Sequence, residues 1–255
     1  MKQIHPGMVK NIIIFSFLAL IAAGCISPSK EQVTPGELFV LGEQDLRAER
    51  FEAARQAFKR LLREYPDSRH RRTALLNLAD SYFQEEEYLE AKVQYSEFVQ
   101  LYPVSPQTSK AYYFLGMSDY NRILDHDQDQ SIAEDALKSF KELKKRFSRS
   151  KYGKKSDEKI KEIRSLLADS DLFIANFYLR RGQRVSAIPR YRDIIKKYRD
   201  QPKIRAEAIY RLGESFRLEE SYEKAGQSYR ILIEEHPTSS FSQDAYDRLL
   251  SLTGK

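Results

Sequence analysis

The sequence has 255 residues, of which 31% are charged, and its formal net charge is a mild +6. Glycine and proline number only 10 and 9, while leucine, alanine, glutamate, lysine and arginine dominate, which is typical of helical proteins and favours stacked helical units over one simple bundle at this length. The single cysteine excludes a disulfide within the chain, so packing alone must hold the fold.

Residues 1–24 have the three zones of a secretory signal peptide. Lys2 and Lys10 provide a positive start, residues 12–21 are apolar except for Ser16, and residues 22–24 are small. An apolar run of about ten residues is too short for a membrane-spanning helix, which needs roughly twenty. The segment therefore predicts export, followed by removal of the signal.

Cys25 directly follows these small residues, and the stretch ALIAAGC resembles the lipobox of bacterial lipoproteins. The resemblance implies that the thiol becomes a thioether to diacylglycerol and that the new amino terminus is acylated as well. Several acyl chains together give stable anchoring. Ile26 stands where lipoproteins retained in the inner membrane often carry aspartate, so the resemblance points to the outer membrane. The alternative is an unmodified cysteine that happens to follow a signal.

Residues 25–35 are predicted to be a flexible tether, because they lack periodicity and contain two prolines. Ten residues span at most about 35 Å. The folded part of the chain is therefore expected to stay near the membrane surface.

An internal repeat follows, and three of its copies align without gaps at 50–68, 87–105 and 221–239. Each copy contains an aromatic residue, then alanine, a second aromatic residue and proline at fixed offsets. The anchors are Phe51, Ala54, Phe58 and Pro66; Tyr88, Ala91, Tyr95 and Pro103; and Tyr222, Ala225, Tyr229 and Pro237. The pattern resembles the tetratricopeptide repeat, a helix-turn-helix unit of about 34 residues.

Two weaker units complete the series. The third contains Ala136 and Phe140 with eight extra residues around 121–130, and the fourth contains Ala187 and Tyr191. The periodicity of 154–171 predicts a longer helix leading into the fourth unit. We therefore predict an all-α fold, an α-solenoid of about five repeats over residues 36–255. The units lie near 36–67, 72–104, 109–149, 168–200 and 206–238, with a terminal helix at 241–252 covering the last one.

A small residue precedes each of the three gap-free copies at a fixed offset. These residues are Gly42, Ala79 and Gly213. They are expected to let the two helices of a unit approach closely, while the aromatic anchors fill the space between neighbouring units. Proline ends the second helix, because it lacks an amide proton and clashes with the preceding turn.

Catalysis and metal binding find little support in the sequence. His70, His126 and His236 lie at repeat ends or in loops, so spacing nominates no catalytic residues, no enzyme activity and no cofactor. The stretch 125–129 resembles the start of a calcium loop, but Gln130 replaces the required glycine and the bidentate glutamate is absent. We interpret it as an acidic loop that caps a helix, with no metal.

The basic run at 144–155 carries seven cations with two aromatic residues interleaved. In a cytoplasmic protein such a run would suggest nucleic acid, but export argues against a nucleic-acid partner. A solvated junction between repeats is one interpretation. Contact with anionic head groups or with an acidic partner is the other.

The concave face of a tetratricopeptide stack exposes first-helix positions that do not serve the core. In repeats one to three these positions hold large apolar side chains, which predict a groove for a substrate peptide. The predicted groove residues are Phe39, Leu46, Leu76, Phe83, Tyr113, Met117 and Tyr120. Alternatively, the tether or the insertion folds back over them. The equivalent positions in repeats four and five are polar.

Two stretches carry a more specific resemblance: DQDQSIAEDALKSFKEL at 127–143 and FYLRRGQRVSAIPRY at 177–191. Together with the lipobox and the interrupted third repeat, they resemble the family of the outer-membrane protein assembly factor BamD. The chain departs from the family at Ser148 and Arg199, where members often have proline.

The resemblance implies a non-enzymatic lipoprotein on the periplasmic face of the outer membrane that works with the barrel assembly protein BamA. Members receive the terminal strand of an unfolded outer-membrane β-barrel protein in their first repeats, and their last repeats dock on a POTRA domain of BamA. The residues that match the docking motif are Arg181, Gly182, Val185 and Arg190. The alternative function is a tetratricopeptide lipoprotein scaffold for other cell-envelope machinery.

Overall fold

The computed structural model describes residues 33–253. The predicted signal segment, Cys25 and all of the predicted tether before residue 33 lie outside the described residues. The described range folds into eleven α-helices joined by short connections. They are α2 (Pro35–Arg47), α3 (Phe51–Glu64), α4 (Arg71–Gln84), α5 (Tyr88–Leu101), α6 (Thr108–Tyr120), α7 (Ser131–Phe147), α8 (Lys151–Arg180), α9 (Arg184–Lys197), α10 (Pro202–Leu218), α11 (Tyr222–Glu235) and α12 (Ser242–Thr253).

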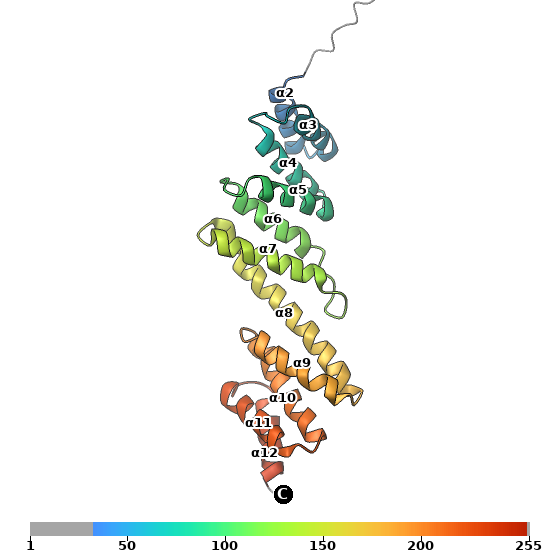
Figure 1. Cartoon of the computed structure of the whole chain (residues 1–255), viewed down its shortest axis with the longest axis vertical. Coiled ribbons are helices and arrows are strands. Elements are labelled where there is room, and N and C mark those ends of the chain that lie inside the picture. Colours follow the sequence, from blue (N-terminus) through green and yellow to red (C-terminus); the bar gives the residue numbers. More distant parts are fainter. Residues whose placement is uncertain (1–32, 254–255) are drawn as a thin grey trace, which may run out of the picture.

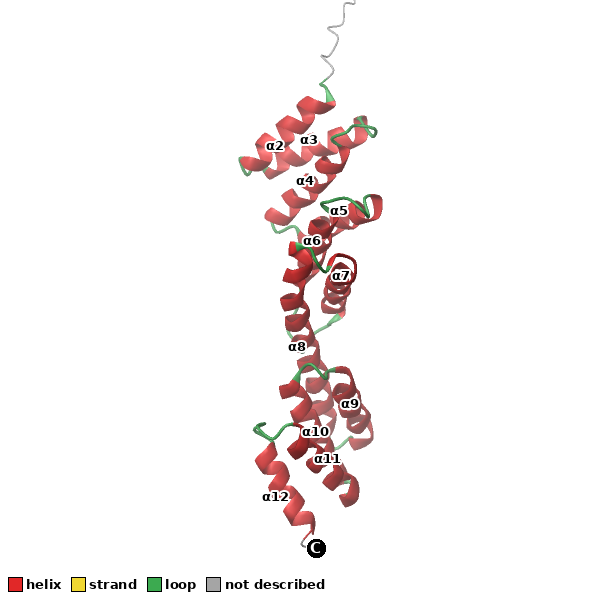
Figure 2. Cartoon of the chain, turned by 90° about the vertical axis from the view of Figure 1, so that its left-hand side faces the viewer, coloured by secondary structure: helices red, strands yellow, loops and turns green. Residues whose placement is uncertain are grey.

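The helices stack in chain order as an elongated rod, with α2 at one end and α12 at the other (Figure 1). Each helix packs on the next, and the first helices of neighbouring units also touch, from α2 against α4 to α8 against α10. A view turned by 90° shows the same serial arrangement (Figure 2). This confirms the predicted all-α solenoid. None of the helices within 33–253 is long and apolar enough to cross a bilayer.

Close approach of the paired helices depends on the small residues that precede each of the three gap-free copies. A Cβ added at Gly42 would lie 2.5 Å from the Phe58 ring, and one added at Gly213 would lie 2.6 Å from the Tyr229 ring. Ala79 and Tyr95 are likewise fully buried. Phe58 and Tyr229 therefore pack on the small residue of their own unit. Tyr95 also stacks on Phe114 of the next unit, with 5.8 Å between the ring centroids, as expected of an aromatic anchor that fills the space between units.

Four of the turns within units end the first helix in the same way. The residue after the helix cap has a positive φ at Glu49, Glu86, Gly182 and Glu220, with values between 58° and 72°. Paired backbone hydrogen bonds close each turn, as from Gly182 N to Leu179 O and from Gln183 N to Tyr178 O. Glutamate is strained at this position, because its Cβ crowds the following carbonyl, whereas glycine is not.

The long helix α8 runs for 30 residues, as the periodicity of 154–171 predicts. The Ser150 hydroxyl accepts a hydrogen bond from Gly153 N and caps its start. The buried residues form two clusters, one within α2–α6 and one within α7–α12, and Tyr112 packs against both. The N-terminal part of α8 also packs on α6, so this helix ties the two halves of the rod together.

Candidate functional site

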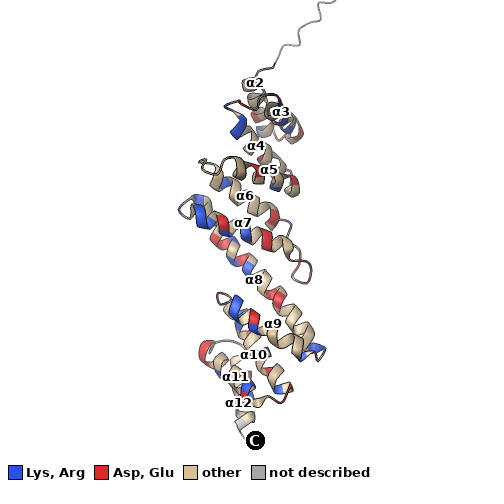
Figure 3. Ribbon diagram, viewed as in Figure 1, with Lys and Arg blue, Asp and Glu red and all other residues tan. Residues whose placement is uncertain are grey.

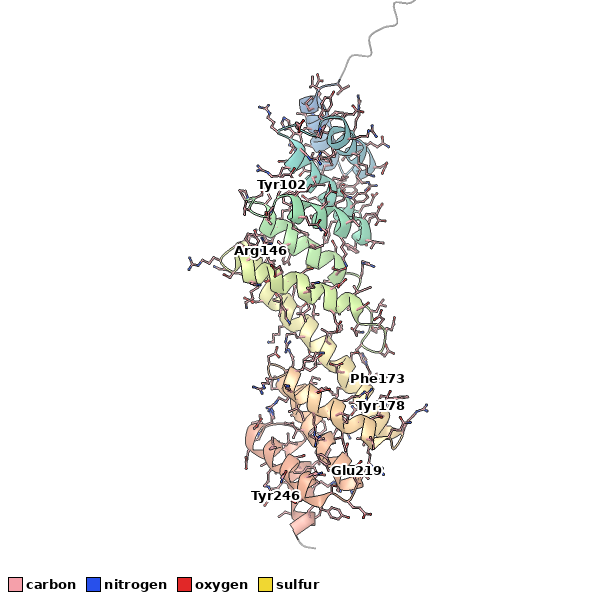
Figure 4. The ribbon with its side chains drawn as sticks, viewed as in Figure 1. Tyr102, Arg146, Phe173, Tyr178, Glu219 and Tyr246 are labelled. Carbon is pink, nitrogen blue, oxygen red and sulfur yellow. The ribbon has the colours of Figure 1, made fainter. Side chains whose placement is uncertain are left out.

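The turns that join the helices lie along two edges of the rod (Figure 1). We call the edge with the turns inside units (48–50, 85–87, 121–130, 181–183 and 219–221) the hairpin edge. We call the edge with the turns between units (65–70, 102–107, 148–150, 198–201 and 236–241) the junction edge. Tyr102 and Arg146 mark the junction edge, and Phe173, Tyr178 and Glu219 lie towards the hairpin edge (Figure 4).

The first two repeats keep only part of the predicted peptide groove open. Leu76 is 4% exposed and belongs to the core, so its assignment to the groove was wrong. Position counting treats all repeats alike, whereas the side chains packed around Leu76 remove it from solvent. Phe39 is half-buried and stacks on the His70 ring at 4.6 Å. Phe83 is half-buried beside the ring of Phe114, at 4.9 Å. Leu46 is also half-buried.

In the third repeat α8 covers much of the predicted groove. The Tyr113 ring lies 5.4 Å from Tyr152, which α8 carries. The Tyr120 hydroxyl donates a hydrogen bond of 2.7 Å to Glu162, and Lys159 sits over the ring at 4.3 Å. Met117 is half-buried against the second core cluster. The long helix α8 therefore covers part of Tyr113 and Tyr120. The cover expected from the sequence was the tether or the insertion.

A recurring polar pair occupies the inner side of three repeats. The aromatic hydroxyl of the second helix donates to a polar side chain fifteen positions earlier, from Tyr95 to Asp80 and from Tyr229 to Glu214. Tyr191 donates in the same way to Asn176, at 2.7 Å. Burial pushes the pKa of Glu214 upward, but hydrogen bonds from Arg217 and Tyr229 outweigh it and lower that pKa.

These polar pairs also join neighbouring repeats. Lys110 contacts Asp80 at 2.5 Å, and Arg248 of α12 contacts Glu214 at 3.3 Å. The pairs were missed in the sequence, although the constant spacing of fifteen from tyrosine to a polar residue is a usable signal. These pairs hold the helices together, and the carboxylates of Asp80 and Glu214 therefore already have hydrogen-bond and ion-pair partners within the chain.

The insertion at 121–130 borders a hollow of about 740 Å³ on α8. Asp125 and His126 line it from the loop, and Asp169 and Phe173 line it from the helix. Burial raises the pKa of Asp169, and Glu207 adds to this effect, whereas His126 opposes it. The hollow is acidic with one aromatic wall, and it was not predictable from the sequence because its two sides lie about forty positions apart.

The acidic loop itself caps a helix as predicted. The Asp129 carboxylate accepts hydrogen bonds from the backbone N–H and the hydroxyl of Ser131, the first residue of α7. These bonds lower the pKa of Asp129. Among residues 33–253 no three histidine, cysteine, aspartate or glutamate side chains are grouped closely enough to hold a metal ion.

The predicted docking residues meet at the hairpin edge of repeat four, at the turn from α8 to α9. Gly182 has a φ of +72°, and nothing lies within 4 Å of a Cβ placed there. Val185 follows and is 84% exposed, a high value for an apolar side chain. The Arg181 guanidinium lies over the Phe177 ring at 4.8 Å. Arg190 is half-buried, lies over Tyr178 at 4.2 Å and donates to Ser186 O.

Further apolar and basic side chains extend this corner. Phe173, Ile174 and Phe177 on the last turns of α8 are 38 to 42% exposed. Arg180 and Arg184 flank the turn, and neither forms an ion pair among the described residues. We call this surface the repeat-four corner: Phe173, Ile174, Phe177, Arg180, Arg181, Gly182, Arg184 and Val185. The corner combines exposed apolar area with unpaired cations, which suits a partner that offers an apolar anchor beside carboxylates.

Comparison with known proteins gives a consistent picture. Residues 31–227 match the family model described as YfiO, outer membrane lipoprotein. The chain is 26% identical to the outer membrane protein assembly factor BamD of Caulobacter vibrioides, over all of this chain and 85% of that protein. It is 28% identical to the BamD of Rickettsia prowazekii, over 90% of this chain and 92% of that one. A solved TPR repeats protein from Bacteroides fragilis is 13% identical with a TM-score of 0.50, over 87% of this chain and all of that one, and this likeness supports the fold alone.

Proposed function

The chain belongs to the YfiO family of outer membrane lipoproteins, and on this premise we propose that it is the BamD-type adaptor of a β-barrel assembly complex. In this role it holds partners together without chemistry of its own. Its substrates are unfolded outer-membrane β-barrel proteins, and its principal partner is a BamA-like barrel assembly protein. The lipid on Cys25 keeps it on the periplasmic face of the outer membrane.

The observation that carries the proposal is the repeat-four corner. Three other turns place glutamate at the strained position that follows the first helix, and repeat four places Gly182 there. Acidic side chains mark the corresponding turns of the other repeats, whereas Arg180, Arg181 and Arg184 make this one basic. Val185 projects beside them at 84% exposure. This corner thus combines cations that form no ion pair within residues 33–253 with exposed apolar area, and we assign it to docking of the POTRA domain.

Capture of a substrate strand belongs to the inner face of the first repeats. Phe39, Leu46 and Phe83 remain half-buried and accessible to a bound side chain. An extended strand places alternate side chains on one face, so an amphipathic strand can present a row of apolar groups to this surface. Tyr113, Met117 and Tyr120 contribute only their exposed portions, because α8 or the core packs against them.

Affinity purification of the lipidated protein from outer membranes tests the assignment. We expect recovery of a BamA-like protein with the wild type, and a loss of at least tenfold when Val185→Asp is combined with Arg181→Glu. Val93→Asp is the matched control, because Val93 on α5 is also exposed, at 56%. Equal recovery with the corner variant would refute docking at this corner. Recovery of cell-wall enzymes alone would favour the scaffold function instead.

A further inference from the structure

The junction edge carries a row of cations that the proposed docking does not use. Their side chains are exposed at three of the five turns between units, and none forms an ion pair with a carboxylate within the described range. These cations are Arg69 and Arg72 at the start of α4; Lys145, Arg149, Lys151 and Lys154 around the α7–α8 turn; and Lys196, Arg199 and Lys203 around the α9–α10 turn. The blue segments at the ends of α7, α8 and α9 show part of this row (Figure 3).

The hairpin edge has the opposite charge over most of its length. Glu49, Glu86 and Glu220 lie at the positive-φ positions of its turns, and all three are exposed. Aspartates of the insertion continue the acidic edge in repeat three. The row of unpaired cations therefore lies opposite these acidic turns. The separation is not complete, because Arg47 and Arg50 on the hairpin edge pair with Glu43 and Asp45, and the last junction turn follows the acidic end of α11.

Exposed apolar side chains occupy the junction turn between the first two basic ones. Val104 is 91% exposed and Leu101 is 50% exposed, both at the α5–α6 turn. The order along the edge is thus basic, apolar, basic and basic. Apolar side chains flanked by cations are typical of surfaces that lie in a membrane interface.

We propose that the junction edge rests on the anionic phospholipid head groups of the membrane that holds the lipid anchor, with Val104 and Leu101 entering the interface. Each cation near an anionic leaflet favours binding by about fivefold. The nine residues between Cys25 and Pro35 span at most about 35 Å, so an acylated Cys25 would hold the rod within reach of the surface. This geometry rests on family membership and on acylation, and it leaves the repeat-four corner facing the periplasm.

A bilayer fits this row better than an acidic protein does. The cations are distributed over three turns that lie along the length of the rod, and a protein partner would need a comparably long acidic face. The tether also raises the effective concentration of the bilayer far above that of any free protein. An acidic protein partner is the outcome that would replace the proposal.

Depth-dependent fluorescence quenching on the full lipidated chain tests this orientation. Val104→Cys carries an environment-sensitive fluorophore at the junction edge, and Glu219→Cys carries it at the hairpin edge as the matched control. Each protein is reconstituted in vesicles of phosphatidylcholine, with or without one third phosphatidylglycerol, that contain a quencher in the acyl region. We expect quenching at position 104 only in the anionic vesicles, and no quenching at position 219 in either.

Charge removal and salt complete the test. Lys145→Gln, Lys151→Gln and Arg199→Gln together should lower the ratio of membrane-bound to free orientations by about a hundredfold, at about fivefold per cation. Salt near 1 M should have a similar effect, because it shortens the screening length to about 3 Å. An unchanged circular dichroism spectrum and unfolding midpoint would show that the variant is folded.

Equal quenching at positions 104 and 219, or quenching that ignores lipid charge, would overturn the proposal. So would absent quenching at position 104 combined with a loss of an acidic protein from purifications of the triple variant. That last result would assign the junction edge to a protein, and it would leave docking at the repeat-four corner intact.

Discussion

Replacing Gly213 with alanine tests the close helix approach on which the repeat depends. The added Cβ would lie 2.6 Å from Tyr229 Cε1, which is closer than real side chains approach. Tyr229 cannot retreat easily, because it is fully buried and its hydroxyl is held by Glu214 at 2.5 Å. Overpacking of this kind costs about 1–3 kcal/mol, and the better helix propensity of alanine offsets about 1 kcal/mol of it.

Gly226→Ala is the matched control in the same repeat. There the new Cβ meets Leu249 at 3.5 Å and Arg230 at 3.8 Å, which are ordinary contacts. Its free energy of unfolding should rise by up to about 1 kcal/mol, because only the propensity gain remains. The two variants should therefore differ by about 1–3 kcal/mol, with Gly213→Ala the less stable.

The assay is thermal unfolding of the purified lipidated protein in detergent, followed by far-ultraviolet circular dichroism. A difference of 1 kcal/mol corresponds to about 2–4 °C in the midpoint for a chain of this size. Both sites lie in repeat five, so they report on the same unit of a solenoid. If Gly213→Ala matched or exceeded Gly226→Ala in stability, the argument that glycine is required for helix approach would be wrong.

Three further predictions follow from the turns, the last histidine and the inner face. Glu220→Gly should raise the free energy of unfolding by about 1 kcal/mol, because it removes strain at a φ of 58°. Glu219→Gly, at a φ of −93°, should lower the free energy of unfolding. A denaturant titration that found the reverse order would contradict the turn assignment. Burial and the nearby Arg205 lower the pKa of His236 below 6.5, so its contribution to stability is present above pH 6.5 and is lost as the pH falls through the folded-state pKa. His236→Gln, which keeps an acceptor for Arg205, should flatten the dependence of stability on pH below neutrality in pH-dependent unfolding; an unchanged slope would show that His236 does not govern it. In fluorescence anisotropy, Leu46→Ser should weaken binding of a peptide that copies the terminal strand of a barrel protein by about three- to tenfold. Leu41→Ser, which changes an exposed leucine outside the predicted groove residues, should leave the affinity unchanged. Equal affinities of the two variants would remove Leu46 from the groove.

Much of the fold was accessible from the sequence because each anchor has a local physical reason. Gly42 and Gly213 recur at one offset from an aromatic ring, and the structure shows those rings against them. The lengthened helix before repeat four also followed from unbroken periodicity. Identical spacing in the three gap-free copies made these close contacts predictable without coordinates.

The inner face was less accessible, because its exposure depends on how far each repeat turns on the next. Leu76 is buried and Tyr113 is covered by Tyr152, although both occupy positions that were expected to open onto the groove. Position counting places a side chain on a face of its own helix and says nothing about what the next helix covers. The hollow beside Asp125 and Phe173 has the same origin, since its walls come from segments far apart in the chain.

Site-specific photocrosslinking in living cells at position 185 tests docking at the repeat-four corner most directly. A photoreactive amino acid replaces Val185 in the full-length protein, and the matched probe replaces Val93. We expect a crosslink between position 185 and a BamA-like protein, at a level at least tenfold above that from position 93. Equal crosslinking from both positions, or none from position 185, would contradict docking at the repeat-four corner.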